Sequence, residues 1–125
     1  VYQLTGLVRI KEAYSMIIAL DFDETFTEDP ALWTAFIVKA KVRLHTVTFV
    51  TYRPSNGNNS DIEYEAECLG LKIIYTAGKQ KQHCFKADVW IDDSPETIIS
   101  YDMICNYKIG CENNNDLQLV KPLST

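Results

Sequence analysis

The chain has 125 residues, which is long enough for one hydrophobic core and too short for two, so we expect a single domain without a large separate cap domain. Hydrophobic residues make up 46% and charged residues 23%, as in ordinary soluble globular proteins, and no apolar run approaches the ~20 residues of a membrane span. The net charge of −5 argues against an extended nucleic-acid partner, because clustered Lys and Arg bind phosphate backbones.

Cysteine usage indicates a reducing compartment. Cys68, Cys84, Cys105 and Cys111 form no C-x-x-C pair and have no histidines at zinc-site spacing. We interpret them as reduced thiols and expect a cytoplasmic protein. A disulfide between Cys105 and Cys111 is the minor alternative.

The two ends of the chain are predicted to lie outside the folded domain. Residues 1–15 lack the basic start, apolar centre and cleavage site of a secretory signal, and Met16 begins the first apolar run directly. We interpret this segment as an N-terminal extension or tag. The alternative, an edge strand over residues 4–10, has equal weight. The domain is then expected over residues 16–111. Residues 112–125, asparagine-rich at their start, are expected to form a loosely attached tail.

Four short apolar, β-branched runs predict strands in the central part of the chain. They cover residues 16–20, 46–50, 73–76 and 89–91. Polar segments separate them, so the runs are too short and too far apart to form one long helix. We therefore expect four strands joined by longer connections.

The connections predict helices. Asp29 and Pro30 are typical of an N-cap and a first helical position, and apolar residues then recur at helical spacing: Leu32, Trp33, Phe36, Ile37 and Ala40. Ser60 or Asp61 is predicted to cap a second, short helix that ends at Gly70.

A third helix is expected to start near Lys81 and a fourth at Pro95, the latter continuing through Thr97, Ile98 and Tyr101. Strands that alternate with helices pair in parallel through right-handed crossovers. The expected fold is therefore α/β, a doubly wound, three-layer Rossmann-like parallel sheet with helices on both faces.

Two carboxylates follow the first predicted strand. Asp21 and Asp23 are two residues apart, so on an extended chain their side chains point to the same face and can converge on one ligand. Open α/β sheets build their active sites at this end of the strands. One carboxylate can then act as a nucleophile and the other as a general acid. For an isolated Asp-x-Asp, a helix cap or a solvated turn is the more common outcome.

Three later segments add to this pair. Thr51 ends the second run and Arg53 follows it, Lys79 and Lys81 follow the third, and Asp92 and Asp93 follow the fourth. Over residues 16–101 the chain resembles the haloacid dehalogenase superfamily of phosphohydrolases, whose pattern is Asp-x-Asp-x-Thr, a strand-terminal Thr or Ser, a Lys and an acidic pair. The resemblance implies the strand order 5-4-1-2-3 and makes residues 16–111 a catalytic domain.

The resemblance also implies roles for the acidic residues. Asp21 would be the nucleophile that forms an aspartyl-phosphate, and Asp23 the general acid and base. Four carboxyl groups would repel a phosphate dianion without a cation, so Mg²⁺ is the expected cofactor. Its ligands would be Asp21, the backbone carbonyl of Asp23, and Asp92. Asp93 would orient a ligand from the second shell.

The remaining candidates are polar or cationic. By resemblance, Thr51 would bind a phosphoryl oxygen, and Lys81 would neutralise the phosphate and hold the nucleophile, with Lys79 and Lys86 left open as alternatives. Thr25 would fix the turn after the first strand through its hydroxyl. Arg53 would either bind the substrate phosphate or anchor its loop.

The sequence therefore predicts a Mg²⁺-dependent phosphomonoester hydrolase. The site has no sizeable cap, because about 25 residues separate Asp23 from Thr51 and most of them form a helix and a strand. We expect a small phosphorylated substrate such as a nucleotide, covered by loops or by a neighbouring subunit of a homo-oligomer. The alternatives are a phosphoprotein or polynucleotide-end phosphatase, and a catalytically silent binding module with the same fold.

Overall fold

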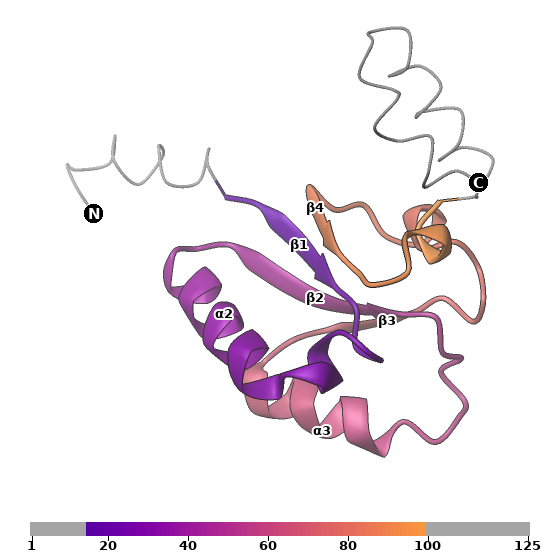
Figure 1. The fold of residues 1–125 in the computed structure, drawn as a ribbon, viewed down its shortest axis with the longest axis horizontal. Coiled ribbons are helices and arrows are strands. Elements are labelled where there is room, and N and C mark those ends of the chain that lie inside the picture. The colour runs from indigo at the N-terminus through magenta and orange to yellow at the C-terminus, as the bar shows by residue number, and fades with distance from the viewer. Residues whose placement is uncertain (1–14, 100–125) are drawn as a thin grey trace, which may run out of the picture.

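The structure is a computed structural model that describes residues 15–99. Its elements, in chain order, are β1 (Ile17–Leu20), η1 (Phe26–Glu28), α2 (Pro30–Val42), β2 (Thr46–Thr51), α3 (Ser60–Leu69), β3 (Ile73–Tyr75), η2 (Lys81–His83), β4 (Val89–Ile91) and η3 (Pro95–Thr97), where η denotes a 3₁₀-helical turn (Figure 1). The predictions for residues 1–14, for Cys105 and Cys111, and for residues 112–125 lie outside the described residues.

The four strands form one parallel sheet in the order β3-β2-β1-β4, which confirms the α/β prediction. In this sheet Leu20 of β1 lies between Phe49 of β2 and Ile91 of β4. Strand β1 is therefore central among the described strands, as expected for a run that is apolar along its whole length. A fifth strand would fall outside the described residues, and its place in the order 5-4-1-2-3 stays a prediction.

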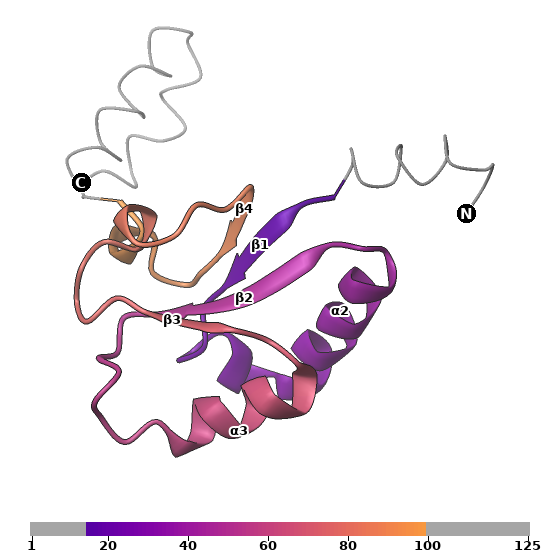
Figure 2. The same ribbon diagram turned by 180° about the vertical axis from the view of Figure 1, so that it is seen from behind.

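Helices α2 and α3 lie together on one face of the sheet (Figures 1 and 2). They cover that face because the two crossovers, β1-α2-β2 and β2-α3-β3, step in the same direction along the sheet and share one hand. The core between them consists of Ile18, Leu20, Phe22, Phe26, Ile37, Ala40, Val47, Phe49, Ile62 and Ala66. Leu32, which we predicted to face this core, is 54% exposed. None of the described helices is long and apolar enough to cross a membrane.

The two helix caps differ in how well the sequence predicts them. The Asp29 carboxylate accepts a hydrogen bond from the Leu32 amide at 3.1 Å, so α2 has the predicted N-cap. Helix α3 has Asn59 at its N-cap position, so the predicted cap at Ser60 or Asp61 is wrong. The Asn59 amide instead donates to two loop carbonyls of residues 54 and 55. Gly70, with φ of +69°, ends this helix as predicted.

The predicted helices at Lys81 and Pro95 are wrong within the described residues, because each is a single 3₁₀ turn. After η2 the chain turns back almost at once to enter β4, where the Asp88 amide bonds to the Ile17 carbonyl at 2.8 Å. In η3 the Thr97 hydroxyl donates to the Ser94 carbonyl at 2.7 Å, a local bond that competes with helix propagation.

The direction in which the chain crosses the sheet reverses after β3, since β4 pairs with β1 on the side away from β2. In open α/β sheets the crevice at such a reversal, beyond the carboxyl ends of the strands, is the usual place for a ligand. The segments that leave β1, β2 and β4 all reach this edge.

Candidate active site

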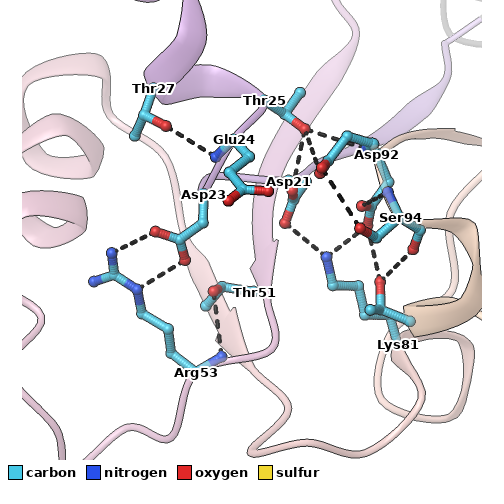
Figure 3. A network of polar contacts seen from close by, with 12 residues as sticks. Asp21, Asp23, Glu24, Thr25, Thr27, Thr51, Arg53, Lys81, Asp92 and Ser94 are labelled. Atoms are coloured by element: carbon cyan, nitrogen blue, oxygen red, sulfur yellow. Dashed lines mark hydrogen bonds and ion pairs between the residues drawn. The ribbon is translucent and has the colours of Figure 1, made fainter.

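Asp21 is fixed at the end of the central strand. Its backbone amide donates to the Ile91 carbonyl at 2.9 Å and so extends the pairing of β1 with β4 by one residue. The residue is only 8% exposed. One carboxylate oxygen accepts from Lys81 Nζ at 2.8 Å and the other from Thr25 Oγ1 at 3.1 Å (Figure 3).

Lys81 is the lysine that the structure brings to this carboxylate. Its side chain is 2% exposed, and its ammonium lies between Asp21, at 2.8 Å, and Asp92, at 2.5 Å. Lys79 and Lys86, the alternatives, are exposed. The chain reaches this position through Ala77 and Gly78, which both adopt left-handed conformations with φ of +53° and +83°. A lysine buried against two carboxylates is uncommon unless its charge is needed there.

The acidic pair after β4 completes this cluster. Asp92 accepts from the Ser94 amide at 2.9 Å as well as from Lys81, and the Thr97 hydroxyl, which donates to the Ser94 carbonyl, lies 3.4 Å from it. The Thr25 hydroxyl lies 3.1 Å from an Asp93 oxygen as well as from Asp21. Because a hydroxyl has one proton, it donates to one carboxylate at a time, and it accepts from the Asp93 amide at 3.3 Å. Thr25 thus joins the first strand to the acidic pair.

Burial and charge shift the proton affinity of two of these groups. Burial raises the pKa of Asp21 from 3.8 to about 6, although Lys81 acts in the opposite direction. Partial burial also raises the pKa of Asp93, but its hydrogen bonds with Asp21 and Thr25 outweigh this effect and leave the pKa below its ordinary value. The surroundings of Asp21 therefore favour its ionised form less than water does.

The donor set suits a hard divalent cation. Asp21, Asp92 and Asp93 each offer a carboxylate oxygen, and these oxygens lie within 4.8 Å of one another. A group of oxygen ligands without nitrogen or sulfur is what Mg²⁺ prefers. Asp21 and Asp92 were predicted as ligands. Asp93, predicted only as an orienting residue, lies in the same group.

Asp23 lies apart from that group. Figure 3 shows its side chain turned toward Arg53, on the opposite side of the site from Lys81 (Figure 3). Both of its oxygens are held by Arg53, at 2.7 Å and 3.0 Å. The carboxylate of the predicted general acid is therefore tied to an arginine in this structure.

The Arg53 guanidinium uses all five of its N–H donors. Besides its two bonds to Asp23 it makes two to Asp61, at 2.7 Å and 2.9 Å, and one to Asn59, at 3.3 Å. The same group lies over the Phe22 ring, 5.4 Å from its centroid. These bonds anchor the loop between β2 and α3. They also lower the pKa of Asp61 to about 2. Sequence reasoning missed this role of Asp61, since its position, eight residues beyond Arg53, carries no motif.

Thr51 is fully buried, and its hydroxyl accepts from the Arg53 amide at 3.3 Å. It lies beneath the site and does not line the cavity at its surface. That cavity has a volume of about 260 Å³ and is lined by Asp21, Asp23, Glu24, Tyr52, Lys81, Asp92, Asp93, Ser94 and Thr97. Glu24, Tyr52, Ser94 and Thr97 were not predicted as site residues. Glu24 has a φ of +63°, a strained value for a residue with a side chain, and its amide bonds to the Thr27 hydroxyl at 2.9 Å.

Comparisons with protein-family models, with curated proteins and with solved structures returned no match to this chain. The fold and the site define the class on their own. The chain is an α/β protein with a Rossmann-like parallel sheet. It carries a carboxylate cluster around a buried lysine, at the point where the direction of the strand order reverses.

Proposed function

We propose that this protein is a Mg²⁺-dependent phosphomonoester hydrolase of the haloacid dehalogenase type. One observation carries the proposal. The Lys81 ammonium is buried between Asp21 and Asp92, at the carboxyl ends of the neighbouring strands β1 and β4. The four-strand order β3-β2-β1-β4 supports the proposed topology, in which a fifth strand lies beyond β4. A cytoplasmic location is a further part of the proposal.

Asp21 would be the nucleophile. Lys81 and Thr25 hold its two oxygens, so the carboxylate is oriented and needs little reorganisation before it attacks phosphorus. The new bond joins a carboxylate oxygen to phosphorus, and the bond from phosphorus to the ester oxygen breaks. The released alcohol takes one proton, and water then hydrolyses the aspartyl-phosphate to phosphate and Asp21.

Asp23 would supply that proton and later accept one from the attacking water. In the structure Arg53 holds its carboxylate away from Asp21, so we propose that Asp23 turns toward Asp21 when substrate binds. Asp61 makes this turn less costly, because Arg53 keeps a bidentate carboxylate partner after Asp23 leaves.

Asp21, Asp92 and Asp93 would hold the Mg²⁺ ion, with the backbone carbonyl of Asp23 as the further predicted ligand. When bound, the ion supplies positive charge that offsets the phosphate dianion and the carboxylates. Lys81 adds a fixed positive charge between Asp21 and Asp92. Thr51 would act indirectly from below the cavity, because its hydroxyl accepts a hydrogen bond from the Arg53 backbone amide.

The experiment is a phosphate-release assay with phenyl phosphate, with Mg²⁺ and with a chelator. We expect release only with the metal, and none from Asp21→Asn, which keeps the shape of the side chain but removes the nucleophile. Glu67→Gln, an exposed change on α3, is the matched control and keeps wild-type activity. Full activity of Asp21→Asn, or of the wild-type protein in the chelator, would contradict the proposal.

A further inference from the structure

The cavity beside Asp21 is strongly acidic. Five of its nine lining residues are carboxylates, and one, Lys81, is a cation. Three of the carboxylates, Asp23, Glu24 and Asp93, are exposed. A substrate that places its phosphate against Lys81 must therefore extend its leaving group past further negative charge.

In the arrangement that the structure shows, neither nearby cation has a donor left for a second anion. Lys81 is buried and already bonds to Asp21 and Asp92, so it can serve only the phosphate that approaches Asp21. Arg53 uses every N–H donor on the residues around it, two of which are carboxylates. When Asp23 turns away, Arg53 regains the two N–H donors that held it, but its charge stays matched by Asp61.

Glu24 adds a negative charge that no cation among residues 15–99 balances. Its carboxylate has no hydrogen-bond or ion-pair partner among residues 15–99. The strained backbone of this residue, with φ of +63°, holds it at the wall of the cavity. Tyr52, which is 43% exposed, lines the same cavity and offers the flat, uncharged surface of its ring.

We infer that the site selects phosphomonoesters whose leaving group carries no anionic group, and rejects those whose leaving group is itself anionic. This inference rests on the proposed function and specifies its substrate class. A nucleoside monophosphate, whose leaving group is an uncharged nucleoside, fits this chemistry. A nucleoside diphosphate, a sugar bisphosphate, an acidic phosphopeptide and the end of a polynucleotide do not.

The test compares three aryl phosphates in the presence of Mg²⁺: phenyl phosphate, 4-carbamoylphenyl phosphate and 4-carboxyphenyl phosphate. The last two have nearly the same shape and differ in charge. We expect kcat/KM for the carboxylate to be about tenfold lower than for the carboxamide. Because exposed charges are screened by salt, this difference should shrink when the ionic strength is raised from 0.02 M to 0.5 M.

Glu24→Gln tests the residue that carries the argument. It should bring the kcat/KM values for the carboxylate and the carboxamide about threefold closer together, whereas Glu67→Gln on α3 should leave their ratio as in the wild type. Equal use of the two substrates by the wild-type protein, or a ratio that does not respond to Glu24→Gln, would overturn the inference alone. Absence of hydrolysis of all three would overturn the proposed function as well.

Discussion

The buried Asp21 carboxylate makes the stability of the metal-free protein depend on pH. Burial raises its pKa from 3.8 to about 6. Between these two values the folded state binds more protons than the unfolded state, so the free energy of unfolding rises as the pH falls through this window. Above pH 6 both states are ionised, and the folded state carries the full cost of a buried charge.

The size of this effect follows from the shift. A pKa that rises from 3.8 to about 6 corresponds to roughly 3 kcal/mol, at 1.36 kcal/mol for each pH unit. Because Asp21 is only 8% exposed, little of this value is lost to solvent screening. A difference of about 3 kcal/mol is a large part of the 5–15 kcal/mol that stabilises an ordinary domain.

Urea unfolding, followed by the fluorescence of Trp33 and Trp90, measures the effect in a chelating buffer between pH 7.5 and pH 4.5. Asp21→Asn has no carboxyl group to titrate at this position, so its free energy of unfolding should lack this contribution. The difference between wild type and variant isolates Asp21 from the other titrating groups. Glu67→Gln, an exposed change from carboxylate to amide, should follow the wild-type curve.

Addition of Mg²⁺ gives a second test of the charge on the Asp21 carboxylate. A divalent cation beside Asp21 favours the ionised carboxylate, so it should stabilise the protein more at pH 7.5 than at pH 4.5. If Asp21→Asn kept the wild-type dependence of stability on pH, the burial of a charged Asp21 would not be its cause.

Three further predictions follow from the same site. Mg²⁺ should raise the melting temperature of the wild-type protein, and Asp92→Asn should remove most of that rise; a full response in the variant would place the metal elsewhere. Lys81→Ala should lower kcat/KM by an amount that corresponds to a loss of about 2 to 4 kcal/mol of transition-state stabilisation. Lys79→Ala, at an exposed position, should leave kcat/KM unchanged. Arg53 holds the pKa of Asp61 at about 2, so the pair stabilises the folded state above about pH 4 and this contribution is lost as the pH falls through 2. In acid titrations followed by circular dichroism, Asp61→Asn should lack this contribution, and an unchanged acid transition would contradict it.

The sequence predicts the strands and α2 well, because their signals are local. The apolar runs are long enough to be recognised, and Asp29 caps α2 through its own side chain. The turns at Lys81 and Pro95 are predicted less well. A lysine or a proline at a helix start gives no information on how soon the chain must enter the next strand.

The site shows the same division between local and long-range information. The order of the motifs places Asp21, Lys81 and Asp92 at one edge of the sheet, and the structure brings them into contact. The pairing of Arg53 with Asp23 and Asp61 depends on how a loop folds back over β1 and α3, and no spacing in the sequence encodes it. For this reason the sequence left open whether Arg53 anchors its loop, which the structure shows it does.

The most direct measurement of the central claim is to trap the phosphorylated protein. The wild-type protein would be mixed with phenyl phosphate and Mg²⁺, quenched in acid and treated with borohydride, which reduces an acyl phosphate on aspartate to homoserine. Peptide mass spectrometry would then locate the reduced residue. Our account predicts homoserine at position 21 and at no other aspartate. Phosphate release without this product, or with the product at position 23 or 92, would contradict it.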